Sequence, residues 1–363
     1  MSQTVLKAEE RVAFALRSLY KQYGYLPYKM SKFEVYDLYA KNKDFLRGGG
    51  VITFNDTDGK LLALKPDVTL SIIKNGNDGE KQKVYYHENV YRISGETKQF
   101  KELMQVGLEC VGVEGEYDLY ETLFLAAASL REISENFVLD IAHLGVLAGV
   151  LEELGGDEKF NREVMRLLAE KNLHETQSLC ESVGIDKDKT EKLLTIVRSY
   201  GDMNDVLKAI EPICANGKAA EAYQELQSLC SLLKTCPFAK NIRLDFSVVN
   251  DMKYYNGLVF KGFVDGVCEG VLSGGQYDGL MKRMGRNARA IGFAVYLDLL
   301  DGFKKSKKEV DVDTLVLIGE NTAPAKIAAA VETLVKEGKS VRVQREKGKL
   351  RAAEILDLTG GKV

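Results

Sequence analysis

The sequence contains little histidine, no closely paired cysteine and no excess of positive charge. Its 363 residues include three histidines, and none of them stands at the spacing of a zinc-binding motif. A protein-built zinc site or a Ser-His-Asp triad therefore has few candidate residues. The six cysteines form no CxxC pair and lie far apart, which favours a reducing compartment and a role as small core residues. The net charge of -3 disfavours tight, non-specific binding of nucleic acid.

Long hydrophobic runs are also absent. One of the longest, LFLAAASL at 123–130, is too short to cross a bilayer, and no apolar segment typical of a signal peptide stands near the N-terminus. We therefore predict a cytoplasmic protein without membrane contact. Hydrophobic residues make up 45% of the chain, which is enough to bury a full core in two or three domains.

The N-terminal third predicts a helix followed by an antiparallel sheet. Apolar residues recur at helical spacing in LKAEERVAFALRSLYKQYGY, and Gly24 fits the C-terminal cap of that helix. The turn signal DTDG joins the β-rich runs VITFN and LLALK, which predicts a hairpin that leads into a helix near Pro66 and Asp67. A longer hairpin is predicted in KVYYHENVYRISGETKQFKELMQVGLECVG.

The remainder predicts helices, further strands and a short terminal segment. Residues 121–236 read as nearly all helix, and their second part, about 155–236, is typical of a helical insertion. Strands resume at IRLDFSVVN, YYNGLVFKGFV and VCEGVLSGG. The lysine-rich residues 303–310 predict a solvated linker rather than a nucleic-acid patch. Residues 311–363 alternate strand, helix, strand and helix, and are short for an independent α/β domain.

The order of these elements and their motifs resembles a known family. LKPDVT, YRIS, QVGLECVG, YYNGLVF, SGGQYDGL and GFAVYLDLL follow one another as in the class II aminoacyl-tRNA synthetases, and specifically the histidyl-tRNA synthetases. The resemblance implies an α+β fold, an antiparallel sheet flanked by helices, over a core of residues 1–302 that includes the helical insertion. It also implies a homodimer formed through the N-terminal helix and strand.

The resemblance further implies a pocket that binds histidine as an effector. A carboxylate and a hydroxyl in LKPDVT would hold the ammonium group, and Glu109 in QVGLE would accept an imidazole N–H. Tyrosines would supply aromatic walls with polar tips. Each position taken alone is more often structural, but seven matching positions together favour a site. The implied effector-binding residues are Asp67, Thr69, Gln105, Glu109, Tyr254, Tyr255 and Tyr277.

The nucleotide side of the family's site is altered in this sequence. Arg92 of YRIS is kept, but the acid that reads adenine is replaced by Ser94, and two arginines are replaced by Asn250 and Leu299. A glycine that leaves room for the nucleotide is replaced by Tyr296. A triphosphate normally needs arginine, lysine or a metal to neutralise it. We therefore predict that the ATP chemistry is lost.

An intact amino-acid pocket without ATP chemistry resembles the regulatory subunits of ATP phosphoribosyltransferase. That family implies a non-catalytic chain, required for the first step of histidine biosynthesis and for feedback regulation by histidine. It would assemble with the short-form catalytic subunit as a hetero-octamer and would need no cofactor, metal or nucleic acid. Two alternatives stay open: an active histidyl-tRNA synthetase core, and a stand-alone sensor of amino acid or uncharged tRNA.

Overall fold

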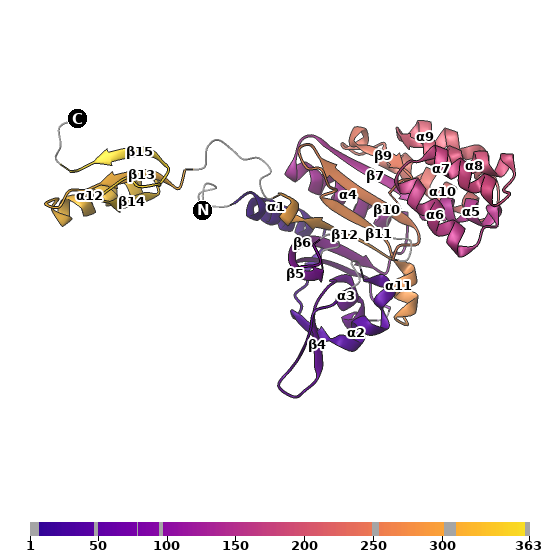
Figure 1. Cartoon of the computed structure of the whole chain (residues 1–363), viewed down its shortest axis with the longest axis horizontal. Helices are drawn as coiled ribbons and strands as arrows, with labels where there is room; N and C mark the ends of the chain where they lie inside the picture. Colours follow the sequence, from indigo (N-terminus) through magenta and orange to yellow (C-terminus); the bar gives the residue numbers. More distant parts are fainter. Residues whose placement is uncertain are drawn as a thin grey trace. The chain divides into compact units, whose positions relative to one another are not determined.

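The computed structural model describes residues 7–46, 50–77, 79–93, 97–248, 254–300 and 310–359. The chain forms two compact units, Met1–Phe303 and Lys304–Val363. Figure 1 shows a large sheet with many helices in the first unit, and helix α12 with a small sheet in the second. No helix in these described ranges is long and apolar enough to cross a membrane.

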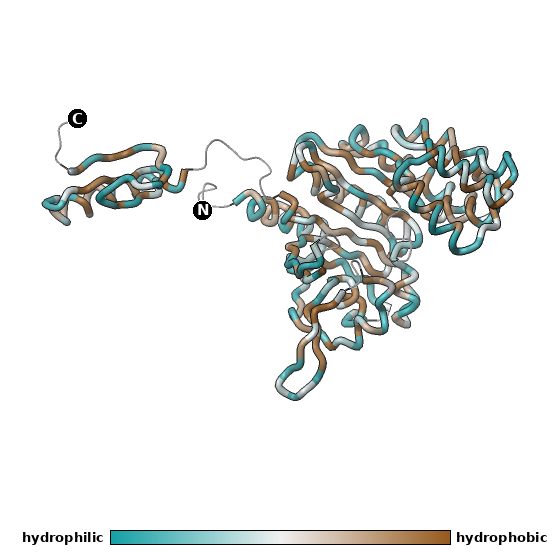
Figure 2. The backbone as a smooth tube through the Cα atoms, viewed as in Figure 1, coloured by the Kyte–Doolittle hydropathy of each residue, from teal (hydrophilic) through white to brown (hydrophobic). Residues whose placement is uncertain are grey.

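The described part of the first unit is built on a nine-stranded sheet, in the order β1-β5-β6-β12-β11-β10-β7-β9-β8. In the middle of this order, from β5 through β6, β12, β11 and β10 to β7, every neighbouring pair is antiparallel. At the two ends, β1 pairs with β5 and β9 pairs with β7 in parallel. Hydrophobic stretches run along these strands (Figure 2). The predicted α+β fold with an antiparallel sheet is thus confirmed. The strands are β1 (Leu26–Pro27), β5 (Gln82–Ile93), β6 (Phe100–Val111), β7 (Phe137–His143), β8 (Tyr200–Gly201), β9 (Ile242–Asp245), β10 (Leu258–Val264), β11 (Leu272–Gln276) and β12 (Ala290–Tyr296).

Two helices, α1 (Ala8–Gln22) and α4 (Glu116–Ile133), pack together against this sheet. Ala13, Leu16 and Tyr20 of α1 form a stripe that is buried because it faces α4 and the strands. The hydroxyls of Tyr20 and Ser129 share a buried hydrogen bond of 2.9 Å between the two helices. Gly24 follows α1 with a left-handed φ of 78°, so the predicted first helix and its glycine stop are confirmed.

A smaller antiparallel sheet in the order β2-β4-β3 leads into the candidate site. The DTDG turn joins β3 to β4 as predicted, and Gly59 in this turn has a φ of 78°. Phe33 and Phe54 meet edge to face across this sheet, with ring centroids 5.3 Å apart. The carbonyl of Lys65 accepts a 2.9 Å hydrogen bond from the backbone of Tyr91, which holds the segment after β4 beside β5. The elements here are β2 (Phe33–Val35), α2 (Tyr36–Lys41), η1 (Lys43–Phe45), β3 (Thr53–Asn55), β4 (Leu61–Leu64) and α3 (Thr69–Asn75).

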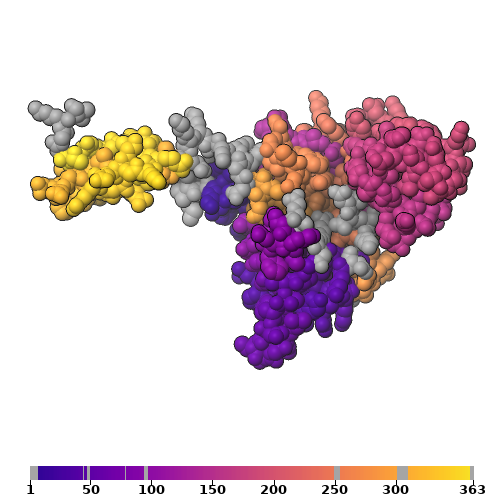
Figure 3. Space-filling view, in the orientation of Figure 1, coloured from indigo at the N-terminus to yellow at the C-terminus, as the bar shows by residue number. Residues whose placement is uncertain are grey.

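The helices between β7 and β9 form a rounded lobe (Figure 3), and from here on the name helical insertion covers all of them, including α5, which precedes residue 155. Asp157, Asn172 and Asp186 each begin one of its helices by accepting a backbone N–H, which satisfies donors that a helix start leaves unpaired. The short strand β8 returns from this lobe to pair with β9. The helices are α5 (Leu144–Leu154), α6 (Glu158–Ala169), α7 (Leu173–Ser182), α8 (Lys187–Arg198), α9 (Met203–Ile210) and α10 (Gly217–Leu233).

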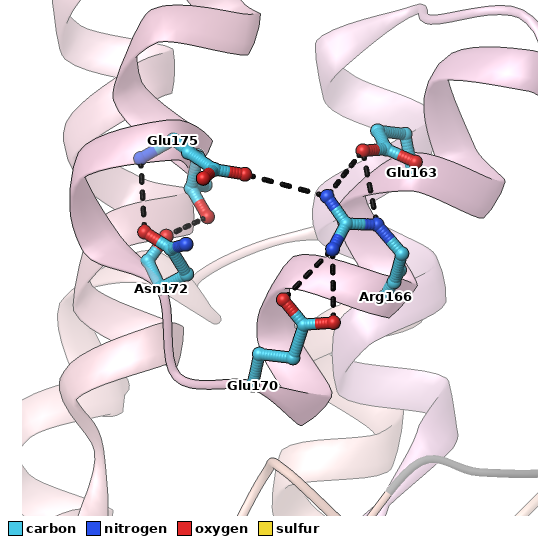
Figure 4. Close-up of polar contacts among 6 residues, drawn as sticks. Glu163, Arg166, Glu170, Asn172 and Glu175 are labelled. Atoms are coloured by element: carbon cyan, nitrogen blue, oxygen red, sulfur yellow. Dashed lines mark hydrogen bonds and ion pairs between the residues drawn. The ribbon is translucent and has the colours of Figure 1, made fainter.

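An ionic cluster on the surface of the helical insertion joins α6 to α7 (Figure 4). The guanidinium of Arg166 lies 2.6 Å from Glu163 Oε1, 2.8 Å from Glu170 Oε2 and 3.3 Å from Glu175 Oε2. Between 43% and 56% of each carboxylate side chain is exposed. Asn172 Oδ1 also accepts a 3.1 Å hydrogen bond from the backbone N–H of Glu175. Because water screens such pairs, the cluster contributes little to stability and mainly orients the two helices.

The expectation that residues 121–236 are nearly all helix is corrected by two strands in this region, β7 and the two-residue β8. The segment Phe137–His143 forms β7, which is paired with β10 on one side and with β9 on the other. Its sequence, FVLDIAH, is a short apolar run, and periodicity does not separate a buried strand from a helix in such a run. This segment is a strand because it pairs with another strand on each side.

In the second unit, the expected order of strand, helix, strand and helix is wrong in its last element. Its last element, Ala352–Asp357, is a strand that pairs in parallel with the central strand of the sheet β14-β13-β15. Alanine and glutamate in this segment favour a helix locally, and the cross-strand pairing of Leu315 with Ile355 overrides that preference. The elements of this unit are β13 (Val312–Leu317), α12 (Pro324–Lys336), β14 (Val341–Gln344) and β15 (Ala352–Asp357).

Candidate functional site

The candidate site is a pocket over strands β5, β6, β11 and β12, bounded by the starts of α3 and α11 (Asp278–Arg283). Its cavity volume is about 30 Å³, which is room for water molecules, so a larger ligand requires the lining side chains to shift. The structure brings together all seven residues implied for effector binding. Their role in binding histidine stays a prediction. The lining residues are Asp67, Val68, Thr69, Tyr86, Arg92, Gln105, Glu109, Tyr254, Tyr255, Ser273, Tyr277, Gly292, Phe293, Ala294 and Tyr296.

The carboxylate of Glu109 is the centre of the pocket's hydrogen bonding. Its Oε1 accepts from Thr69 Oγ1 at 2.7 Å, and its Oε2 accepts from the Tyr277 hydroxyl at 2.7 Å. Glu109 is 3% exposed and stands opposite Gly292 in the register of β6 and β12. A Cβ at Gly292 would overlap the Glu109 carboxylate, so this position requires glycine. An ionised carboxylate offers about four acceptor sites, which leaves capacity for an N–H donor from a ligand.

Asp67 supplies a second carboxylate at the start of α3. Its Oδ1 accepts a 3.0 Å hydrogen bond from the backbone N–H of Leu70, and its Oδ2 lies 3.9 Å from Arg92 Nη2. Arg92 in turn donates from Nε to the carbonyl of Pro66 at 2.9 Å. Two carboxylates and one guanidinium therefore face the pocket, a charge balance that suits a ligand carrying an ammonium group.

Tyrosines and a glutamine supply neutral donors around these charges. Burial, together with the negative charge of Glu109, raises the pKa of Tyr86 and of Tyr277 far above the ordinary value, so both hydroxyls stay protonated. Tyr254 and Tyr255 meet edge to face, with ring centroids 4.8 Å apart. Gln105 Nε2 is buried and has no hydrogen-bond partner among the described residues. Such a donor suits a ligand oxygen or ring nitrogen.

The altered nucleotide positions are only partly described by the structure. Tyr296 lines the pocket, and its hydroxyl shares a 2.7 Å hydrogen bond with Ser273 Oγ. Leu299 is not among the pocket-lining residues and packs against the hydrophobic core. Ser94 and Asn250 lie outside the described residues. The loss of ATP chemistry therefore stays a prediction, with an aromatic ring observed at one altered position.

Sequence reasoning missed Tyr86, Ser273 and Gly292 as pocket residues. The signal for Tyr86 was strand alternation, because Val84, Tyr86 and Glu88 point to one face of β5. Gly292 opens the motif GFAVYLDLL, but its role in the pocket depends on the strand paired beside it. In the described ranges, no group of three or more His, Cys, Asp or Glu residues is placed to hold a metal ion.

The sequence model of the histidyl-tRNA synthetase family matches residues 3–300. The chain belongs to this family. It is also 28% identical, over 350 residues, to the ATP phosphoribosyltransferase regulatory subunit of Acetivibrio thermocellus, an alignment that covers 93% of this chain and 83% of the relative. The predicted resemblance to these regulatory subunits is thus confirmed.

Solved structures share the fold of this histidyl-tRNA synthetase family member. An ATP phosphoribosyltransferase regulatory subunit/histidyl-tRNA synthetase from Bacillus halodurans matches with a TM-score of 0.78 at 22% identity, covering 97% of this chain and 94% of that chain. A chain of the ATP phosphoribosyl transferase (HisG:HisZ) complex from Thermotoga maritima matches with a TM-score of 0.63 at 21% identity, covering 80% of this chain and 97% of that chain. The class II synthetase-like fold is therefore confirmed.

Proposed function

We propose that this protein is a non-catalytic regulatory subunit of an ATP phosphoribosyltransferase, with the transferase activity in a partner catalytic subunit. The name carried by its relatives supports this assignment. The charge inventory of the pocket supports it independently. Among the described lining residues the single cation is Arg92, which already contacts Pro66 and Asp67. One engaged guanidinium is poorly suited to neutralise a triphosphate.

Histidine is the effector that we propose for the pocket. Asp67 would accept from the ammonium group, Glu109 would accept an imidazole N–H, and Gln105 Nε2 would donate to the ligand. Each of these groups lines the pocket, and the two carboxylates carry the charge that a cationic group requires. A ligand that binds one state of the assembly better than another shifts the assembly toward that state. The end product of the pathway could thereby regulate the first enzyme.

The assembly belongs to the same proposal. We expect a homodimer formed through α1 and β1, and a hetero-octamer with the short-form catalytic subunit. Phe14 on α1 and Leu26 on β1 support an interface there, because their exposed fractions are 53% and 68%. A cytoplasmic location stays a prediction. Sedimentation of a monomer at micromolar concentration, unchanged when the catalytic subunit is added, would contradict the assembly.

The test is phosphoribosyl transfer by a short catalytic subunit, measured with and without this protein across a histidine titration. We expect activity to require this protein and to fall as histidine rises. Asp67→Asn and Glu109→Gln each remove a charged acceptor worth about 1.5 to 3 kcal/mol, so histidine binding should weaken about tenfold or more. Both variants should still activate transfer, because activation depends on the contact surface. Failure of the wild-type chain to activate transfer would refute the regulatory role.

Two further outcomes separate the parts of this proposal. If both variants bind histidine and respond to it like the wild type, the effector site lies elsewhere, and the regulatory role stands without this pocket. Histidine-dependent pyrophosphate exchange at ordinary synthetase rates would instead favour an active histidyl-tRNA synthetase core. We expect no such exchange.

A further inference from the structure

A continuous series of contacts runs from the pocket to the helical insertion. It starts at Tyr277, whose hydroxyl donates to Glu109 inside the pocket and whose backbone N–H donates to the carbonyl of Ala290 at 3.0 Å. The next residue, Asp278, accepts the N–H of Ala290 on Oδ1 at 2.9 Å. This pair of hydrogen bonds ties the wall of the pocket to the first residue of β12. A shift of Tyr277 therefore moves the backbone beside Arg289.

Arg289 carries the contacts onward to α10. Its Nε lies 3.7 Å from Asp278 Oδ2, and its Nη2 donates to Glu225 Oε1 at 2.7 Å. The other oxygen of Glu225 lies 3.1 Å from His143 Nε2. One guanidinium thus stands between the carboxylate of Asp278, the residue after Tyr277, and a carboxylate of the helical insertion. Without it the two like charges would have no cation between them, which is unfavourable where water is partly excluded.

His143 is the last residue in this series of contacts. Its Nδ1 accepts the backbone N–H of Gly145 at 3.1 Å and so caps the start of α5. Because Nδ1 is an acceptor, the neutral ring carries its proton on Nε2, and this N–H donates to Glu225. The same Glu225 therefore contacts both the end of strand β7 and Arg289. Its position determines the polar contacts on both sides.

Close packing makes α5 and α10 move as one body. A Cβ at Gly145 would lie 2.8 Å from the Cβ of Ala222, and a Cβ at Gly149 would overlap the backbone of Ala219. The two helix backbones therefore approach closely through small residues, and neither slides without losing this packing. Glu225 lies one turn along α10 from Ala222, so a force on its carboxylate acts on both helices.

We propose that Arg289 is a positioning residue that couples the pocket to the helical insertion, so that ligand binding at Glu109 and Tyr277 changes how firmly α10 is held. The identity of the ligand rests on the function proposed above, whereas the coupling itself is a property of the free chain. A donor from the ligand that engages Glu109 alters the hydrogen bond from Tyr277. Asp278, Ala290 and Arg289 then transmit that change to Glu225.

Hydrogen exchange on the full free chain tests the coupling. Glu225→Gln should speed exchange in α10 and also in the peptide 277–283, which is linked to Glu225 through the contacts of Arg289. Arg289→Gln should do the same, by about fivefold or more, the lower end of typical coupling between sites. Both substitutions break the same series of contacts, so the exchange rates of the double variant should match those of the single variants. Arg289→Lys keeps a cation and should restore part of the protection. Glu221→Gln, an exposed carboxylate on the same helix, is the matched control and should leave both peptides unchanged.

Two results would overturn the proposal. One is faster exchange confined to α5 and α10 with peptide 277–283 unchanged, which would make Glu225 a purely local contact. The other is a double variant in which the increases in exchange caused by the two single substitutions add together. Calorimetry separates this proposal from the assigned effector: with coupling, Glu225→Gln weakens histidine binding about fivefold from outside the pocket. If the wild-type chain does not bind histidine, the effector assignment fails, and the exchange experiment still decides the coupling.

Discussion

Two groups of carboxylates in the first unit are built in opposite ways. In the pocket, Glu109 is 3% exposed, and its oxygens accept from the neutral hydroxyls of Thr69 and Tyr277. On the helical insertion, three glutamates surround the half-exposed guanidinium of Arg166 (Figure 4). The exposed cluster is neutralised by a cation, whereas the Glu109 carboxylate accepts hydrogen bonds from two neutral hydroxyls.

The difference lies in what each arrangement leaves for a ligand. An exposed ion pair is screened by water and already uses its charge on its partner. A buried carboxylate is costly unless hydrogen bonds satisfy it, and neutral donors satisfy it without cancelling its charge. The pocket therefore retains an anionic acceptor for a cationic or N–H-bearing ligand. The surface cluster only orients α6 and α7.

The largest effect should come from Gly292→Ala, which places a Cβ where the Glu109 carboxylate lies. Overpacking of this kind should cost about 3 kcal/mol of unfolding free energy and displace Glu109. Denaturant unfolding measures the loss, with Gly279→Ala as the matched control, since a Cβ there meets nothing within 4 Å. Equal stability of the two variants would show that the pocket is loosely packed and would weaken the comparison.

Tyr277→Phe should have the next largest effect. It removes a hydroxyl that donates to a buried carboxylate at 2.7 Å while it keeps the ring. A hydrogen bond to a charged group contributes about 1.5 to 3 kcal/mol, so we expect a loss of about 2 kcal/mol in denaturant unfolding. Tyr200→Phe on the exposed strand β8 is the control and should change stability little. A neutral result at Tyr277 would mean that Glu109 is satisfied without this hydroxyl.

In its exposure, Glu225 lies between the buried Glu109 and the exposed glutamates around Arg166. Its contribution to the stability of the protein should depend on pH. Hydrogen bonds from His143 and Arg289 lower the pKa of Glu225 from 4.5 to about 2. A carboxyl whose pKa is lowered by folding stabilises the protein above the unfolded pKa, and this contribution is lost as the pH falls from about 4.5 to about 2. Glu225→Gln should therefore destabilise the chain at pH 7 by about 1 kcal/mol, after allowance for solvent screening. The difference from wild type should shrink at pH 3, and a constant difference would contradict this account.

The smallest effect should come from Arg166→Gln in the surface cluster. Its partners are about half exposed, so a slight fall in melting temperature is expected, and this fall should diminish in high salt. Scanning calorimetry at low and high ionic strength measures both. A loss as large as that of Tyr277→Phe would show that the two carboxylate groups do not differ in the way described.

Much of the fold followed from local patterns in the sequence. The stripe of α1, the DTDG turn and the long hairpin of β5 and β6 each depend on residues a few positions apart. The strands β7 and β15 did not follow, because FVLDIAH and AAEILD carry no period that distinguishes a strand from a helix. Those two segments depend on neighbours that come from distant parts of the chain.

The sequence by itself determined the residue types of the candidate site, since the motifs that contain Asp67, Glu109 and Tyr277 can be read directly from it. Only the tertiary structure decided how these residues are used. Glu109 and Gly292 meet because β6 and β12 pair in one register, and Arg289 meets Glu225 because α10 packs across α5. Such contacts join residues far apart in the chain, and their geometry is fixed by strand register and helix packing rather than by any local preference.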